Sequence, residues 1–245
     1  MPAYEEFEAS SEIVRFVECF WTSVSLQPTN IQVVPDGCVD VVIKIPKDGG
    51  LQLDLVGAMT QPKTVAVSIG QQFLGIRFKP GMASSFVDGN LNELTDRSVP
   101  AQIWFGNVAD SIARKIVRCE DVRERLGLLQ PLLRSPRVPS PAQTAIEKLT
   151  STHGKTTIEE MCDLAHVGER HLRRSFQAAS GLSPKRLSSI LRFRRAKQLI
   201  DQGFDLAAIA VEAGYYDQPH FTREFLRYAK VTPSVAARKS LKKID

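Results

Sequence analysis

The sequence predicts an α+β protein of two domains, a β-rich barrel or sandwich with trailing helices followed by an all-α domain. Short β-branched segments punctuated by turn residues fill residues 1–105. A proline-rich segment then interrupts the chain, and helical periodicity dominates everything after it. These three observations set the fold class and the order of the domains.

Three segments of the first part read as strands. Residues 39–45 are a β-branched run after the turn signal Pro35-Asp36-Gly37. Residues 65–69 alternate in polarity and end at Gly70, and residues 73–78 end at a Pro-Gly turn. Helical spacing replaces this pattern over residues 107–134.

The segment 135–141 holds three prolines and is the best domain boundary, because proline disfavours helix in itself and in the residue before it. We therefore expect a β-rich domain at 1–134, a linker at 135–141 and a helical domain at 142–245. Charge changes at the same place. Residues 1–140 carry 14 basic and 16 acidic side chains, whereas residues 141–245 carry 18 and 11. Only the second part has the charge of a polyanion binder.

Two related units lie in the helical part, at 157–184 and 205–233. Each has a short helix, a turn and a helix with the pattern apolar-x-Arg-x-Phe, then a hydroxyl-Pro step that starts another helix. A helix-turn-helix needs this layout, since one helix braces the other in the major groove of DNA. The helices are expected roughly at 141–153, 156–165, 168–179, 184–202, 205–213, 217–229 and 233–240.

Individual residues fit these roles. Leu172 and Phe176 lie four apart and form one inward face, as do Phe221 and Phe225. Asp217 is a suitable N-cap for the second recognition helix, and Gly214 suits the turn before it because glycine adopts positive φ without strain. The helix at 184–202 would span roughly 28 Å and could present both recognition helices to successive major grooves. Six of its basic residues are expected in solvent or on phosphate: Lys185, Arg186, Arg192, Arg194, Arg195 and Lys197.

The sequence does not favour a disulfide-bonded protein, a metal-dependent enzyme or a membrane protein. The four cysteines are widely spaced, which fits neither disulfides nor a zinc site and suits a reducing cytoplasm. All four histidines follow the boundary, so the first domain lacks the cluster that a metal-dependent enzyme needs. We expect no secretory signal, because the first ten residues are acidic, and no membrane span, because no apolar run is long enough. Asp36 and Asp40 can bind a ligand or cap a turn; we favour the turn. For Cys38, Cys162, Trp21, Trp104 and Phe105 we favour a core role over a reactive or pocket-lining one.

The second unit carries a specific string, Gly214-Tyr215-Tyr216-Asp217-Gln218-Pro219-His220-Phe221-Thr222-Arg223-Glu224-Phe225, followed by Val231-Thr232-Pro233. With it, the segment at about 142–240 resembles the AraC family of bacterial transcription regulators. The resemblance implies double-stranded DNA as partner and implies contacts from Arg170, Arg173 and Arg174 in the first unit and from Gln218, Pro219, Thr222 and Arg223 in the second. The first unit departs from the family at Cys162, His166 and Gly168.

The first domain has a looser likeness. Phe20-Trp21, residues 34–40, Val56-Gly57 and residues 74–81 look like a small uncharacterised sensor domain that precedes such DNA-binding modules. The implied fold is a cupin-like barrel, and no ligand is implied.

These observations predict a non-enzymatic, cytoplasmic regulator that reads DNA and is modulated by a small molecule in the first domain. It would use no cofactor, can form a homodimer, and would meet RNA polymerase if it activates. One alternative is a constitutive regulator whose first domain serves only for dimerisation. A DNA-reading enzyme with a reactive cysteine is disfavoured, because the cysteines are isolated.

Overall fold

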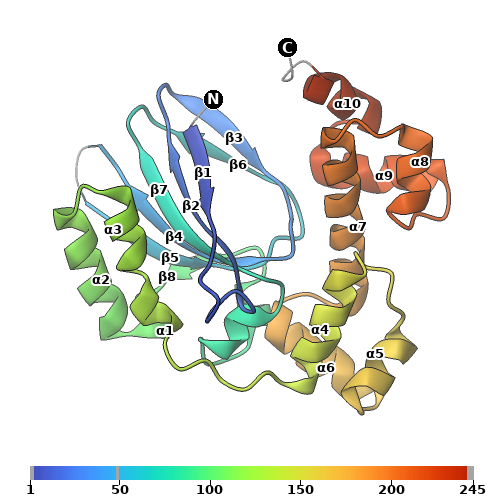
Figure 1. The fold of residues 1–245 in the computed structure, drawn as a ribbon, viewed down its shortest axis with the longest axis horizontal. Coiled ribbons are helices and arrows are strands. Elements are labelled where there is room, and N and C mark those ends of the chain that lie inside the picture. Colours follow the sequence, from blue (N-terminus) through green and yellow to red (C-terminus); the bar gives the residue numbers. More distant parts are fainter. Residues whose placement is uncertain (1–2, 48–49, 242–245) are drawn as a thin grey trace.

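A computed structural model describes residues 3–47 and 50–241 (Figure 1). The outer ends of the two predicted domains, residues 1–2 and 242–245, lie outside the described residues. The strands are β1 Ala3–Phe7, β2 Val17–Val24, β3 Thr29–Val33, β4 Val39–Ile45, β5 Gln52–Val56, β6 Lys63–Val67, β7 Gln72–Phe78 and β8 Ser98–Pro100. The α-helices are α1 Gln102–Phe105, α2 Asn107–Arg118, α3 Val122–Gly127, α4 Pro141–Ser151, α5 Ile158–Ala165, α6 Glu169–Ser180, α7 Pro184–Asp201, α8 Leu206–Glu212, α9 Gln218–Ala229 and α10 Pro233–Leu241. Short 3-10 turns are η1 Met82–Ser85, η2 Leu91–Leu94 and η3 Gln130–Leu133.

The strands pair as two antiparallel sheets. Six form a sheet in the order β1-β2-β7-β4-β5-β8, and β3 pairs with β6 in a second sheet. The helices α1, α2 and α3 lie on one side of these strands, and α4 to α10 lie on the other (Figure 1). The predicted α+β class, a β-rich part with trailing helices before an all-α part, is confirmed.

One face of the large sheet is the core of the first half. Phe20, Ile76, Val41 and Leu55 are cross-strand neighbours in one row, so their side chains point to the same face. The last three are fully buried. Helices α1 and α2 pack against β5 on this half of the molecule, and Ile112 and Ile116 of α2 join the same apolar cluster. Burial of these apolar faces holds the trailing helices on the sheet.

The opposite face of the sheet carries charged residues among apolar ones. Cys19, Arg77 and Asp40 form the adjoining cross-strand row. The Arg77 Nε lies 3.3 Å from both Asp40 Oδ1 and Asp36 Oδ2. Burial raises the pKa of Asp40 to about 7, with Arg77 opposing this shift and Asp36 adding to it. Asp36 also accepts a 2.9 Å hydrogen bond from the backbone nitrogen of Cys38, so the turn-capping interpretation holds for Asp36.

The helices of the second half begin at capping residues. Ser140 and Thr157 each form a capping box with the residue three positions on, and Ser183 and Asp217 cap α7 and α9. Each observed helix lies within about two residues of its expected range. The helical pattern at 107–134 is divided into α2, α3 and η3.

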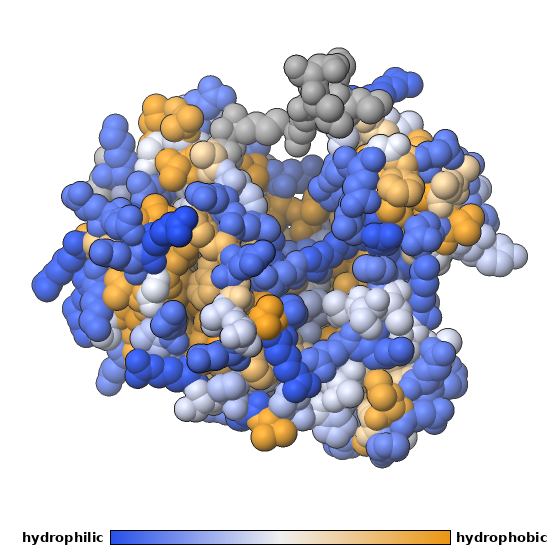
Figure 2. All heavy atoms as spheres, in the orientation of Figure 1, coloured by the Kyte–Doolittle hydropathy of each residue, from blue (hydrophilic) through white to orange (hydrophobic). Residues whose placement is uncertain are grey.

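The two halves touch along η1, η2 and α7. A Cβ on Gly37 would lie 2.6 Å from Leu187 Cδ1, and one on Gly81 would lie 2.7 Å from Ile146 Cδ1. Both glycines have φ near 80°, so their turns need glycine for conformation as well as for space. Thr95 Oγ1 donates to the Gly181 carbonyl at 2.5 Å. Figure 2 shows a hollow between the halves in the upper part of that view.

Candidate nucleic-acid interface

The first helix-turn-helix unit consists of α5 and α6. Its turn places His166 in the left-handed region at φ 52°, followed by Gly168 as N-cap of α6 without a side-chain cap. Leu172 and Phe176 are fully buried, as their spacing predicts. The apolar face of α6 thus packs against α4, α5 and α7.

The opposite face of α6 is exposed and basic. Arg170, Arg173 and Arg174 are all exposed, so the three predicted residues of this unit share one surface. Arg173 forms an ion pair with Glu169, with 2.6 Å between Nη2 and Oε1. Arg170 and Arg174 take part in no hydrogen bond or ion pair within the described residues. Two guanidinium groups of α6 are therefore available to an acceptor.

The second unit consists of α8 and α9. Gly214 has φ 78°, and Asp217 accepts a 2.6 Å hydrogen bond from the backbone nitrogen of His220. Both match the roles predicted for the turn and the N-cap. Phe221 and Phe225 are almost fully buried, with an edge contact between their rings at 5.7 Å between centroids.

The start of α9 carries the predicted contact residues of this unit. Gln218, Pro219 and Arg223 are exposed, and Thr222 is partly exposed on the same helix. His220 is half-buried and stands edge-on to Tyr215. The exposed face combines a guanidinium, an amide and a hydroxyl, which are the donors that read guanine and adenine edges in the major groove.

The helix α7 joins the two units. Its 18 residues span about 27 Å at 1.5 Å per residue. Figure 1 shows α6 with α4 and α5 near one end of α7, and α8 and α9 near the other. The two exposed faces thus belong to separate small bundles held by one rigid element.

The expectation that all six basic residues of α7 remain in solvent or on phosphate is wrong for three of them. Arg192, Arg194 and Arg195 pair with Glu224, Glu18 and Glu212 respectively. Each carboxylate belongs to another element that packs on α7, so tertiary packing removes these arginines from the free basic surface. Lys185 and Lys197 are exposed, and Lys197 pairs with Asp201 at 2.8 Å.

The sequence patterns did not predict a polar cluster that lies between α7 and α9. Ser189 Oγ lies 3.0 Å from Tyr228 Oη and donates to Glu224, which in turn lies 3.6 Å from Arg192. Ser189 and Tyr228 are buried. The hydroxyl of Ser189 in the middle of an otherwise apolar helix face was the only signal for it. The cluster fixes α9 against α7.

Some expectations on single residues are now settled. Cys38 is buried, as expected for a core residue, and burial raises its pKa well above the usual value. Cys162 is only partly buried. Trp104 and Phe105 are partly buried against the core, and the ring of Trp21 lies over Gly75.

Within residues 3–47 and 50–241, no three His, Cys, Asp or Glu side chains are grouped so as to hold a metal ion. None of the helices described has the length and apolarity to cross a membrane.

Comparison with known families gives two matches. Residues 5–100 match a family described as "Domain of unknown function (DUF6597)", and residues 161–239 match a family described as "Helix-turn-helix domain". A protein of Haemophilus influenzae named "Uncharacterized HTH-type transcriptional regulator" is 35% identical over 78 residues, which are 31% of this chain. The match spans about a quarter of that relative's length.

Solved structures also show similarity. ToxT from Vibrio cholerae aligns over 89% of this chain and 98% of its own, with 12% identity and a TM-score of 0.47. A DNA-binding transcriptional dual regulator from Escherichia coli K-12 aligns over 43% of this chain and 96% of its own, with 21% identity and a TM-score of 0.38.

The family matches fall on the two parts that the fold separates, the sheet with its turns and the paired helix-turn-helix units. Residues 161–239 are therefore similar to a helix-turn-helix domain family, and they follow a segment, residues 5–100, that is similar to the DUF6597 family.

Proposed function

We propose that this protein is a sequence-specific, DNA-binding transcription regulator. The observation that carries the proposal is the pair of exposed donor-bearing faces on α6 and α9, presented by one helix of about 27 Å. That length is close to the roughly 34 Å that separates successive major grooves on one side of B-DNA. A single chain can then contact two adjacent grooves.

Seven residues are proposed to contact DNA. Arg170, Arg173 and Arg174 act from α6, whereas Gln218, Pro219, Thr222 and Arg223 act from α9. Arginine donates in pairs to guanine, and glutamine donates to and accepts from adenine. The second unit is the stronger base reader, because its N-terminus is capped by Asp217 and its face offers an amide and a hydroxyl beside the guanidinium. The first unit has a glycine N-cap and supplies mainly cations.

We assign each function to the segment that the sequence predicts for it. These segments are a sensing domain at 1–134, a linker at 135–141 and a DNA-binding domain at 142–245. In this scheme a small molecule bound to the first domain changes the DNA affinity of the second by shifting the populations of two domain arrangements. The contacts of Gly37, Gly81 and Thr95 with the second half supply a physical route for that coupling. A homodimer, and RNA polymerase in the case of an activator, are further partners in this proposal. Because the main partner is the chromosome, the protein acts in the cytoplasm, as a binding protein and not as an enzyme.

Selection from random DNA by the full chain tests the proposal. We expect an enriched sequence with two half-sites about 10 base pairs apart. Fluorescence anisotropy should then show binding to that sequence at least 1,000-fold tighter than to shuffled DNA at fixed salt. Equal affinity for both DNAs would contradict the sequence-specific function.

One measurement distinguishes the ligand-responsive regulator from the alternative, a constitutive regulator with a dimerisation domain. Analytical ultracentrifugation would give a dimer in both cases, whereas thermal shift against a metabolite library would give a stabilised first domain only in the ligand-responsive case.

A further inference from the structure

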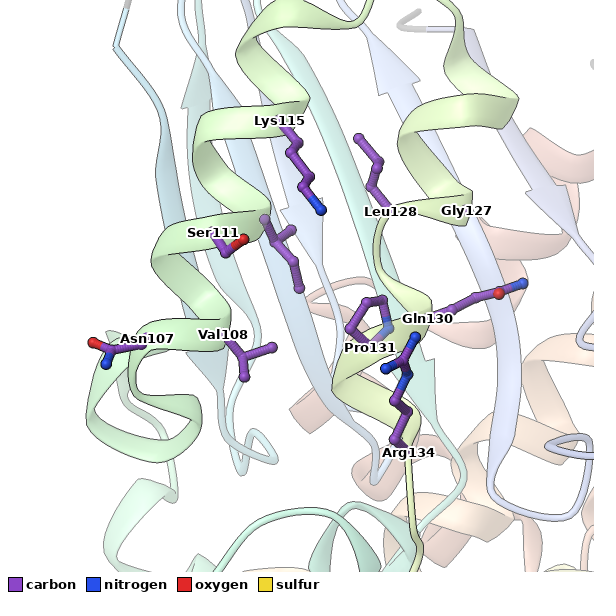
Figure 3. A pocket seen from close by; sticks show the side chains of 10 residues that line it. Asn107, Val108, Ser111, Lys115, Gly127, Leu128, Gln130, Pro131 and Arg134 are labelled. Carbon is purple, nitrogen blue, oxygen red and sulfur yellow. The ribbon is translucent and has the colours of Figure 1, made fainter.

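Two basic side chains converge on a groove in the first half of the molecule. Lys115 of α2 and Arg134, which follows η3, both line a pocket of about 470 Å³ (Figure 3). Lys115 extends into the space between the helices from one end, and the Arg134 side chain points into it from the other. In the part of the chain that the structure describes, neither cation forms an ion pair or a hydrogen bond.

The remainder of the lining is amphipathic. Val108, Ile112, Leu128 and Pro131 supply apolar surface, and Ser111 and Gln130 supply a hydroxyl and an amide. An apolar pocket with a few convergent polar groups is the usual composition of a small-molecule site. With two like charges as the only ionic groups among its lining residues, this pocket is complementary to an anion.

The face of the sheet that carries Arg77 offers a contrasting case. There Arg77 is already shared between Asp36 and Asp40 at 3.3 Å, and the ring of Trp21 covers Gly75. A ligand would have to replace these existing contacts. In the groove the two cations have no ion-pair partner among the described residues, so an anion gains ion pairs without replacing any that the structure shows.

We propose that the groove between α2 and η3 binds a small organic anion with an apolar or aromatic body, whose acidic group lies between Lys115 and Arg134. The assignment of this ligand as the effector rests on the proposed function. The position of Arg134 supports that role, because Arg134 leads directly into the linker. Three residues on, the backbone nitrogen of Arg137 donates to the Ser85 carbonyl of η1 at 2.9 Å. A ligand held by Arg134 therefore fixes the segment through which the first half leads into α4.

The experiment uses 2-naphthoate as the probe and 2-naphthamide as its neutral analogue, titrated into the full chain by isothermal calorimetry. We expect 2-naphthoate to bind at least tenfold more tightly than 2-naphthamide. Lys115→Met and Arg134→Gln should each weaken 2-naphthoate at least fivefold and leave 2-naphthamide unchanged. Arg114→Gln is the matched control, since Arg114 is exposed beside Lys115 on α2 but does not line the groove. Ser111→Trp fills the groove and should abolish binding of both probes while the protein still melts cooperatively.

Equal affinity of the two probes, or 2-naphthoate binding that is unchanged in both Lys115→Met and Arg134→Gln, would overturn the anion site. The selected DNA separates this inference from the proposed function. Binding of 2-naphthoate that leaves DNA affinity unchanged would contradict the effector role and leave both the groove and DNA binding standing. Loss of sequence-specific DNA binding in every condition would contradict the proposed function, and the calorimetry would still decide the groove.

Discussion

The guanidinium of Arg194, on the helix that joins the two helix-turn-helix units, pairs with the carboxylate of Glu18 on β2, 176 residues earlier in the chain. Cys38 Sγ lies 3.4 Å from the same carboxylate and 3.8 Å from the guanidinium. Burial lowers the pKa of Arg194, so the ion pair lies in a partly desolvated environment. It ties the sheet of the first half to the central helix of the second.

This pair should couple the two halves measurably. A double-mutant cycle of Glu18→Ala and Arg194→Ala is expected to give a coupling of about 0.5–1 kcal/mol in urea unfolding, a modest value because both side chains are partly exposed. Each variant should also increase the rate at which trypsin cuts in the segment 134–140. The exposed pair of Lys197 and Asp201 lies within α7 and is the control, for which linker cleavage should not change. Strict additivity of the two mutations would show that the pair does not hold the halves together.

Arg223→Ala should weaken specific DNA binding. If Arg223 reads a base, the loss is about 1–3 kcal/mol with relaxed specificity at one position of the selected sequence. Arg227→Ala removes the same charge from the same helix, where Arg227 lies over the Tyr228 ring and is the matched control. Anisotropy with single-base variants of the selected sequence measures both. Identical profiles for the two variants would remove Arg223 from base recognition.

Glu224→Ala should destabilise the second unit. It leaves the partly buried Arg192 guanidinium without its carboxylate, at a cost of about 2–3 kcal/mol in the free energy of unfolding. Tyr228→Phe removes only the hydroxyl that lies 3.0 Å from Ser189 and should cost about 1 kcal/mol. Chemical denaturation monitored by circular dichroism measures the two values. A cost for Tyr228→Phe equal to that of Glu224→Ala would contradict this ranking.

Asp40 makes stability depend on pH. Its pKa is raised by burial to about 7 in the folded state, against about 3.9 in an unfolded chain. Between these values the folded state binds more protons than the unfolded state, so this residue's contribution to stability falls as pH rises from about 4 to about 7. Asp40→Asn lacks this titration. The wild type should therefore lose about 1–3 kcal/mol relative to Asp40→Asn between pH 5 and pH 8, measured by urea unfolding at each pH. A constant difference between the two proteins across this range would refute the shift.

Local patterns in the sequence settled much of the fold. The helices of the second half were found from 3.6-residue periodicity and from capping residues such as Thr157 and Asp217, because these interactions lie within one or two turns of the chain. The strand at 39–45 followed in the same way from a β-branched run after a turn. The inward faces of α6 and α9 were equally local, since residues four apart on a helix share one side.

Only the tertiary structure decided which charged groups form ion pairs. The register of β2, β7 and β4 sets Arg77 beside Asp40, and the packing of α7 occupies Arg192, Arg194 and Arg195. The packing of α2 against η3 brings Lys115 and Arg134 to one groove, where neither has an ion-pair partner among the described residues. The sequence by itself determined the elements and their exposed faces, because periodicity and caps act over a few residues. It could not determine these partners, because an ion pair between segments up to 176 residues apart depends on how whole elements dock.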